Sequence, residues 1–147
     1  MREHDASQVG AMTNHEISVI IRRCFPDVQA VYVFGTLGTE YERTDSDADI
    51  ALLLPHATAK AAGSLVLSEC RFALEDLLGR KVDLINLRLV DTVFQLRIVE
   101  EGRLILVADQ FAAASFEMLT LSFYQKLQQE RAPILEQIAA TRQVLET

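Results

Sequence analysis

The stretch FGTLGTEYERTDSDADIALLL, residues 34–54, decides the fold of this chain. It joins two apolar segments, AVYVF at 30–34 and DADIALLL at 47–54, through a polar loop that contains two glycines. Short runs of aliphatic and aromatic side chains that end at a glycine or a proline are typical of buried β-strands. The stretch therefore predicts two buried strands connected by a polar loop.

Outside this stretch, the sequence predicts helices that alternate with two more strands. Apolar side chains recur at helical spacing in the longer segments, and capping residues stand near their ends. The predicted helices are 14–24, with Asn14 as N-cap and Pro26 beyond its end, 58–78, with Thr58 as cap and Gly79 after it, and 91–101, between Asp91 and Gly102. The predicted strands are 81–87 and 103–108.

The last part of the chain is predicted to be helical from 109 to 146, with a kink or a split at Pro133. A straight helix of that length would extend about 57 Å, at roughly 1.5 Å per residue. A domain of this size cannot cover such a helix, so we expect part of its apolar stripe to contact another chain.

This order of elements predicts an α/β (α+β) protein with one mixed sheet of about four strands covered by helices. The polar residues 1–13 are expected to form a poorly ordered tail. Residues 14–108 would form the domain, and 109–147 a C-terminal helical segment that packs on the domain, on a partner, or on both.

Composition narrows the possible functions. The chain has 147 residues, half of them hydrophobic, and a formal net charge of −7. Binding to nucleic acid through a basic surface is disfavoured, because the sequence has no Lys/Arg cluster longer than Arg22-Arg23.

The sequence has no signal-peptide pattern and no apolar run of membrane-spanning length, so a cytoplasmic location is expected. Cys24 and Cys70 are expected to be reduced and buried.

Three aspartates form the candidate chemical site. Asp47 and Asp49 are two residues apart at the start of a strand, so their side chains would point to one face about 7 Å apart. Asp83, between apolar neighbours in the third strand, would complete a carboxylate cluster if the strands are adjacent. Carboxylates in such a cluster, together with substrate phosphates, suit Mg²⁺. Gly35 and Thr36, where the first strand meets the loop, would approach phosphate oxygens.

Simpler interpretations exist for each of these residues. Asp47 and Asp49 could form a solvated turn, Asp83 could face water from an edge strand, and Thr36 could merely cap a turn. Asp45 is interpreted as a solvated residue, because counting from it makes the loop two residues short. Tyr41 could stack on a base, and the three histidines are interpreted as surface residues.

The pattern G-[S/T]-x10-D-x-D, followed by an aspartate in a later strand, resembles the nucleotidyltransferase superfamily. More closely, residues 14–140 resemble the minimal nucleotidyltransferase (MNT) antitoxins of HEPN/MNT toxin–antitoxin pairs. The resemblance rests on FGT…DSDADIALL, on KVDLINLR with its following DTV, and on FEMLTLSFYQKLQQERAPIL.

The resemblance implies a nucleotidyltransferase fold and an activity that moves AMP from ATP to a tyrosine of a HEPN RNase toxin. It implies that Gly35 and Thr36 bind the nucleotide, that Asp47, Asp49 and Asp83 bind Mg²⁺, and that Asp83 accepts the proton of the attacking hydroxyl. The chain departs from the family pattern in having Thr36 for the usual serine and Glu40 for a usual glycine. Glu40 and Glu42 add negative charge near the expected phosphate site, which Arg43 could offset.

Two other functions remain open at this point. The chain could be an antitoxin that neutralises its toxin by binding alone, which Glu40 favours. It could also be a nucleotidyltransferase for a small molecule such as an aminoglycoside, although the chain is short for such an enzyme without a second subunit.

Overall fold

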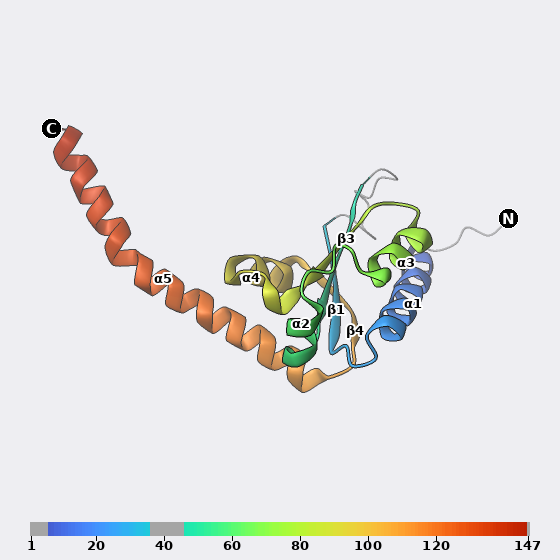
Figure 1. Ribbon diagram of the computed structural model, residues 1–147. Coiled ribbons are helices and arrows are strands. Elements are labelled where there is room, and N and C mark those ends of the chain that lie inside the picture. The colour runs from blue at the N-terminus through green and yellow to red at the C-terminus, as the bar shows by residue number, and fades with distance from the viewer. Residues whose placement is uncertain (1–5, 36–45, 147) are drawn as a thin grey trace.

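A single mixed sheet forms the centre of the protein, with helices on both faces (Figure 1). The computed structural model describes residues 6–35 and 46–146. The strand order is β3-β2-β1-β4, and β1 runs antiparallel to β2 and β4 while β2 and β3 are parallel. The prediction of a four-stranded mixed sheet is therefore confirmed. The strands are β1 (Ala30–Phe34), β2 (Ala48–Leu53), β3 (Val82–Asn86) and β4 (Arg103–Val107).

The helices lie between and after the strands. The parallel pair β2 and β3 is joined through two helices, as a crossover connection requires. Asp91 caps α4 by accepting a hydrogen bond from Phe94 N, as predicted, and Gly79 follows α3 in the left-handed conformation. The helices are α1 (Ala6–Cys24), α2 (His56–Ala62), α3 (Glu69–Leu78), the 3-10 turn η1 (Leu87–Leu89), α4 (Thr92–Glu101) and α5 (Gln110–Glu146).

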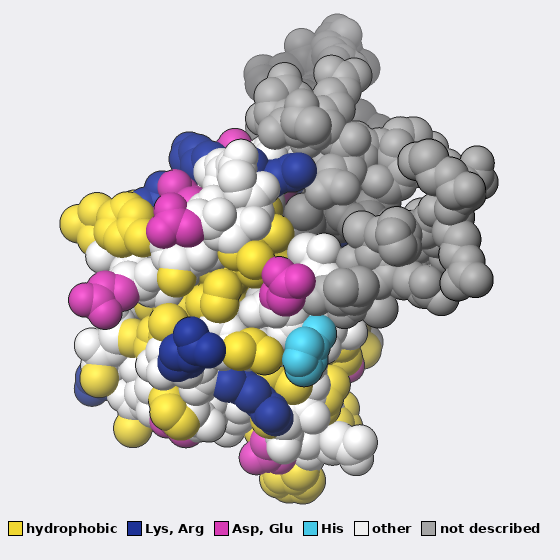
Figure 2. All heavy atoms as spheres, turned by 90° about the vertical axis from the view of Figure 1, so that its right-hand side faces the viewer, with side chains coloured by type: hydrophobic (Ala, Val, Ile, Leu, Met, Phe, Trp, Pro, Cys, Tyr) yellow, Lys and Arg dark blue, Asp and Glu magenta, His cyan; other side chains and the backbone are white. Residues whose placement is uncertain are grey.

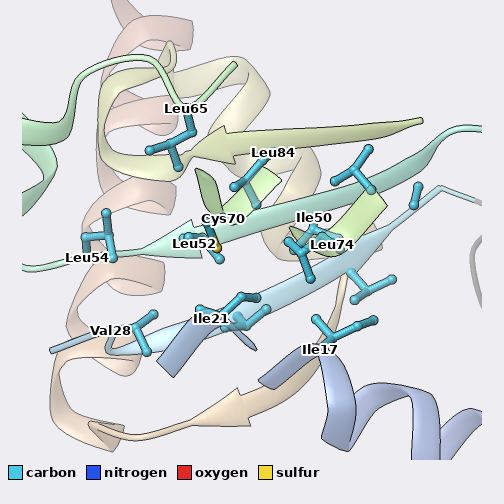
Figure 3. Packing of buried hydrophobic residues seen from close by; sticks show 14 of the residues in the cluster. Ile17, Ile21, Val28, Ile50, Leu52, Leu54, Leu65, Cys70, Leu74 and Leu84 are labelled. Atoms are coloured by element: carbon cyan, nitrogen blue, oxygen red, sulfur yellow. The ribbon is translucent and has the colours of Figure 1, made fainter. Parts of the chain in front are cut away.

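Alternation along the strands separates two hydrophobic cores. Ile50 and Leu52 of β2 pack with α1 and α3 on one face, which we call the α1/α3 face (Figure 3). Ala51 and Leu53 point the other way and pack with α4 and α5 on the α4/α5 face. The side chains that pack against the sheet from the helices are Ile17, Ile21, Cys70 and Leu74 on the first face, and Ile98, Ala113 and Phe116 on the second.

Helix α5 is fixed to the sheet only near its start. Phe116 and Thr120 are buried, and Tyr32 Oη donates a hydrogen bond of 2.7 Å to Glu117 Oε1. Beyond these contacts most side chains are exposed, and Figure 1 shows the helix running away from the domain. We call residues 121–141 the α5 arm.

The predicted start of the first helix is wrong, and of the kink or split predicted at Pro133 the split does not occur. Helix α1 begins at Ala6, so the predicted tail is helical from that residue and Asn14 lies inside the helix instead of capping it. Its first residues, ASQVGAM, include alanine, glutamine and methionine, which favour helix, and extending a formed helix is easier than starting one. The proline at 133 lies within α5 and does not split it.

The predicted helix 58–78 is two helices, α2 and α3. Gly63 ends α2 with a φ of 61°, and Ser68 caps α3 by accepting a hydrogen bond from Arg71 N. The Asn86 side-chain amide donates to the carbonyls of Ala59 and Gly63, both at 2.9 Å, and so satisfies the end of α2. Thr58 lies inside α2 and is not its cap.

The surface over α1 and α3 carries both signs of charge. Figure 2 shows acidic and basic side chains interspersed with hydrophobic ones over its described part.

The two cysteines differ in exposure. Cys24, the last residue of α1, is exposed, contrary to the prediction, while Cys70 is buried in the core as predicted. Within the described ranges, no helix is both long and apolar enough to cross a membrane.

Candidate active site

Strand pairing brings Asp49 and Asp83 together. Ala48 N donates to Lys81 O at 2.8 Å, and this sets the parallel register in which Asp49 is the direct partner of Asp83. Asp49 alternates with the core residue Ile50, so it points to the α4/α5 face, and Asp83 shares that face as its register partner. The expectation that the second and third strands are neighbours is confirmed.

Gly35 lies against the same carboxylate. It directly follows Phe34, the antiparallel partner of Asp49, and its φ is 72°. A Cβ atom at Gly35 would stand 2.4 Å from Asp49 Oδ2, closer than any side chain tolerates. Both the backbone conformation and the close approach require glycine here.

The electrostatic environment disfavours a negative charge on Asp49. The pKa of its carboxyl is raised from 3.8 to about 6, chiefly by burial and then by the charge of Asp83, a hydrogen bond with Asp83 and the charge of Asp47. Arg97 of α4 acts in the opposite direction. A group shifted in this way by neighbouring carboxylates is typical of a functional site.

Asp47 is more exposed than the other two aspartates. It immediately precedes β2 and is exposed, whereas Asp49 and Asp83 are half-buried. Among the described residues, no three His, Cys, Asp or Glu side chains are arranged to hold a metal ion.

The donor chemistry nevertheless fits a hard divalent cation. Asp49 and Asp83 offer oxygen ligands side by side, and the missing side chain of Gly35 leaves space at one of those oxygens. A cation would also remove the repulsion that raises the pKa of Asp49.

Several predicted features lie outside the described residues. Thr36, the second predicted nucleotide-binding residue, belongs to the loop between Gly35 and Ser46, as do Tyr41 and Asp45. The glutamates at 40 and 42 and the arginine at 43 lie in the same loop.

Sequence reasoning missed the part of the site that α4 contributes. The Phe94 ring meets the Phe34 ring edge-on, with 6.1 Å between centroids, and Arg97 lies one turn further along α4. The sequence alone does not show which sheet face α4 covers, so neither residue could be assigned.

The fold agrees with comparison to known proteins. The family model described as "Polymerase beta, Nucleotidyltransferase" matches residues 16–111, so the chain belongs to this nucleotidyltransferase family. Among individual proteins, it is similar to the protein adenylyltransferase MntA of Shewanella oneidensis. The two are 30% identical over 129 residues, which are 88% of this chain and 89% of MntA.

Solved structures of toxin–antitoxin complexes show the same fold. A Shewanella oneidensis complex of a tri-AMPylated HEPN toxin with an MNT antitoxin matches with a TM-score of 0.64 and 27% identity, covering 88% of this chain and 98% of the other. A toxin–antitoxin structure with AMP-PNP matches with a TM-score of 0.64 and 30% identity, covering 86% and 98%. The resemblance to MNT antitoxins is therefore confirmed.

Proposed function

We propose that this chain is an antitoxin that transfers AMP from ATP to a tyrosine of a partner HEPN toxin and thereby inactivates the toxin. The observation that carries the proposal is the pairing of Asp49 with Asp83 beside Gly35, on one face at one edge of the sheet. The relationship to MntA, which is named a protein adenylyltransferase, supports the same activity.

In the proposed reaction, the tyrosine oxygen attacks the α-phosphorus of ATP and pyrophosphate leaves. Asp83 accepts the proton of the attacking hydroxyl, and Asp47, Asp49 and Asp83 are the residues that would hold Mg²⁺ facing the phosphates. Gly35 and Thr36 bind the phosphates with backbone and hydroxyl groups. Mg²⁺, when bound by the aspartates, would neutralise phosphate charge and align the leaving group.

The test uses this chain with ATP, Mg²⁺ and the protein encoded by the adjacent reading frame. Intact mass spectrometry should show the partner gaining one or more AMP units, and the Asp47→Ala/Asp49→Ala variant should abolish the gain. Circular dichroism of the variant controls for folding. An unchanged partner mass with every divalent metal tried would exclude the proposed enzyme.

A second function, neutralisation by binding alone, is favoured by one observation. Asp47 is exposed while Asp49 and Asp83 are half-buried, and among the described residues no three His, Cys, Asp or Glu side chains are arranged to hold a metal ion. Expression of the Asp47→Ala/Asp49→Ala variant beside the toxin in cells separates the two functions. Growth at the wild-type rate would select binding alone, and growth arrest would select catalysis.

A further inference from the structure

Between α4 and α5 lies an open groove with a volume of about 900 Å³. We call it the α4–α5 groove. Its walls combine apolar and cationic side chains, and it runs from the start of α4 to the α5 arm. The residues that matter for its chemistry are Arg88, Val93, Arg97, Phe123, Leu127 and Arg131.

The apolar walls of the groove are uncovered. Val93 is 50% exposed and Phe123 is 54% exposed, although both are large hydrophobic residues. The apolar surface continues along the α5 arm through Ile134, Leu135 and Ile138, each more than half exposed. Several large apolar side chains left exposed on one helix and its neighbour are typical of an interaction site.

The charge of the groove is opposite to that of the whole chain. Three arginines line it in a protein with a net charge of −7. The carboxylate in its lining, Asp91, already accepts the capping hydrogen bond from Phe94 N. Arg97 Nε lies 3.2 Å from Glu101 Oε2, but both side chains are exposed, and an exposed ion pair contributes little to stability. A partner that carries carboxylates beside apolar side chains therefore fits this surface.

The groove adjoins the candidate active site. Arg97 is part of its lining and also acts on the charge of Asp49. Phe94 lines the groove and contacts Phe34, the residue before Gly35. A protein seated on the groove would thus have its surface next to the paired aspartates, where a transfer reaction requires the acceptor hydroxyl.

We infer that the α4–α5 groove docks the protein acceptor of the AMP transfer, through a segment of that acceptor that carries acidic and apolar side chains near the modified hydroxyl. The inference rests on the proposed function and adds to it the surface that selects the substrate. ATP would bind independently at the aspartates.

The experiment compares two double variants of the full chain. Phe123→Ala/Arg131→Glu changes the groove, and Leu121→Ala/Gln129→Glu makes similar changes on α5 at residues outside the groove lining. Transfer to the adjacent-frame partner is followed by mass spectrometry while the concentrations of partner and of ATP are varied separately. The groove variant should raise the KM for the partner at least tenfold and leave the KM for ATP unchanged, and the matched control should change neither.

The outcomes separate this inference from the proposed function. An unchanged partner KM, or an increase in the KM for ATP instead, would overturn the docking surface while transfer itself stands. If the wild type transfers no AMP, calorimetric affinity for the partner replaces KM. A tenfold loss of affinity in the groove variant alone would then support the docking surface, and equal affinities would refute it.

Discussion

The carboxylate of Asp49 is held where its own charge is unfavourable. Burial and the neighbouring Asp83 raise its pKa from 3.8 to about 6, so between these pH values the folded protein binds more protons than the unfolded chain. Folding therefore becomes less favourable as pH rises from about 4 to 6, and the full deficit persists at neutral pH. The site gives up stability to keep two carboxylates together.

Asp49→Asn should accordingly stabilise the metal-free protein at pH 7.5. We expect the free energy of unfolding to rise by about 1–2 kcal/mol, after allowance for solvent screening of a half-buried group. The gain should become much smaller at pH 4, where Asp49 is protonated in the folded protein and about half protonated in the unfolded chain. Urea unfolding in EDTA at both pH values measures it, and a variant less stable than wild type at pH 7.5 would contradict the prediction.

Gly35 meets two separate constraints, and substitution can distinguish them. Gly35→Ala would strain a backbone with a φ of 72° and push a Cβ against Asp49 Oδ2. Gly79→Ala is the matched control, because its φ is 65° and nothing lies within 4 Å of the added Cβ. Both should lose about 1–2 kcal/mol of stability by thermal or urea unfolding. Only Gly35→Ala should also lower AMP transfer, by tenfold or more, and equal activities would show that the close contact is unimportant.

The candidate site was largely predictable from residues that lie close together in sequence. The D-x-D spacing and the alternation in β3 placed Asp49 and Asp83 correctly, because a strand fixes which side chains share a face. Arg97 and Phe94 could not be predicted, because their position depends on how α4 packs on the sheet. The exposure of Asp47 could not be predicted either, because the spacing of two aspartates does not determine how exposed the end of a strand is.

At the scale of secondary-structure elements, limits were harder to predict than types. A run of alanines and leucines around Gly63 suggested one helix, but the helix ends there because Asn86 from β3 binds its last carbonyls. That partner is more than twenty residues away in sequence. Tertiary contacts of this kind cannot be read from local periodicity.

Asn86 should therefore be important for the connection between β2 and β3. Asn86→Ala removes two hydrogen bonds of 2.9 Å from a side chain that is 4% exposed and leaves the Ala59 and Gly63 carbonyls without that donor. We expect a loss of about 2–3 kcal/mol in the free energy of unfolding. Ser64→Ala is the control, because Ser64 is exposed and lies just after α2. It should cost less than about 0.5 kcal/mol. Equal losses in chemical unfolding would show that Asn86 does not hold the end of α2.

The attachment of α5 to the sheet depends on Tyr32. Its buried hydroxyl donates to Glu117, and burial followed by this contact raises the pKa of Tyr32, so it stays protonated as a donor. Tyr32→Phe should cost about 1–3 kcal/mol, because it leaves a half-buried carboxylate without its donor. Glu117→Gln keeps an acceptor and should cost less. Urea unfolding of both variants at pH 7.5 tests this order, and the reverse order would contradict it.

The whole molecule is a covered domain with a long, uncovered extension. The 37 residues of α5 would extend about 55 Å at roughly 1.5 Å per residue, and the buried contacts lie within its first third. The expectation that part of this helix contacts another chain follows from the difference between its length and the short stretch that is buried. Figure 1 shows the arm running past α4 and away from the sheet, and the α4–α5 groove lies between these two helices.

Hydrogen exchange should divide α5 into two parts. In the free chain, amides of 110–120 should exchange slowly, because Phe116 and Thr120 are packed on the domain, while those of the α5 arm should exchange at least tenfold faster. Adding the partner should slow exchange in the arm and leave 110–120 unchanged. Slow exchange throughout the free helix would contradict this division. Arm protection that grows with the concentration of the chain alone would mean that a second copy, and not the acceptor protein, covers it.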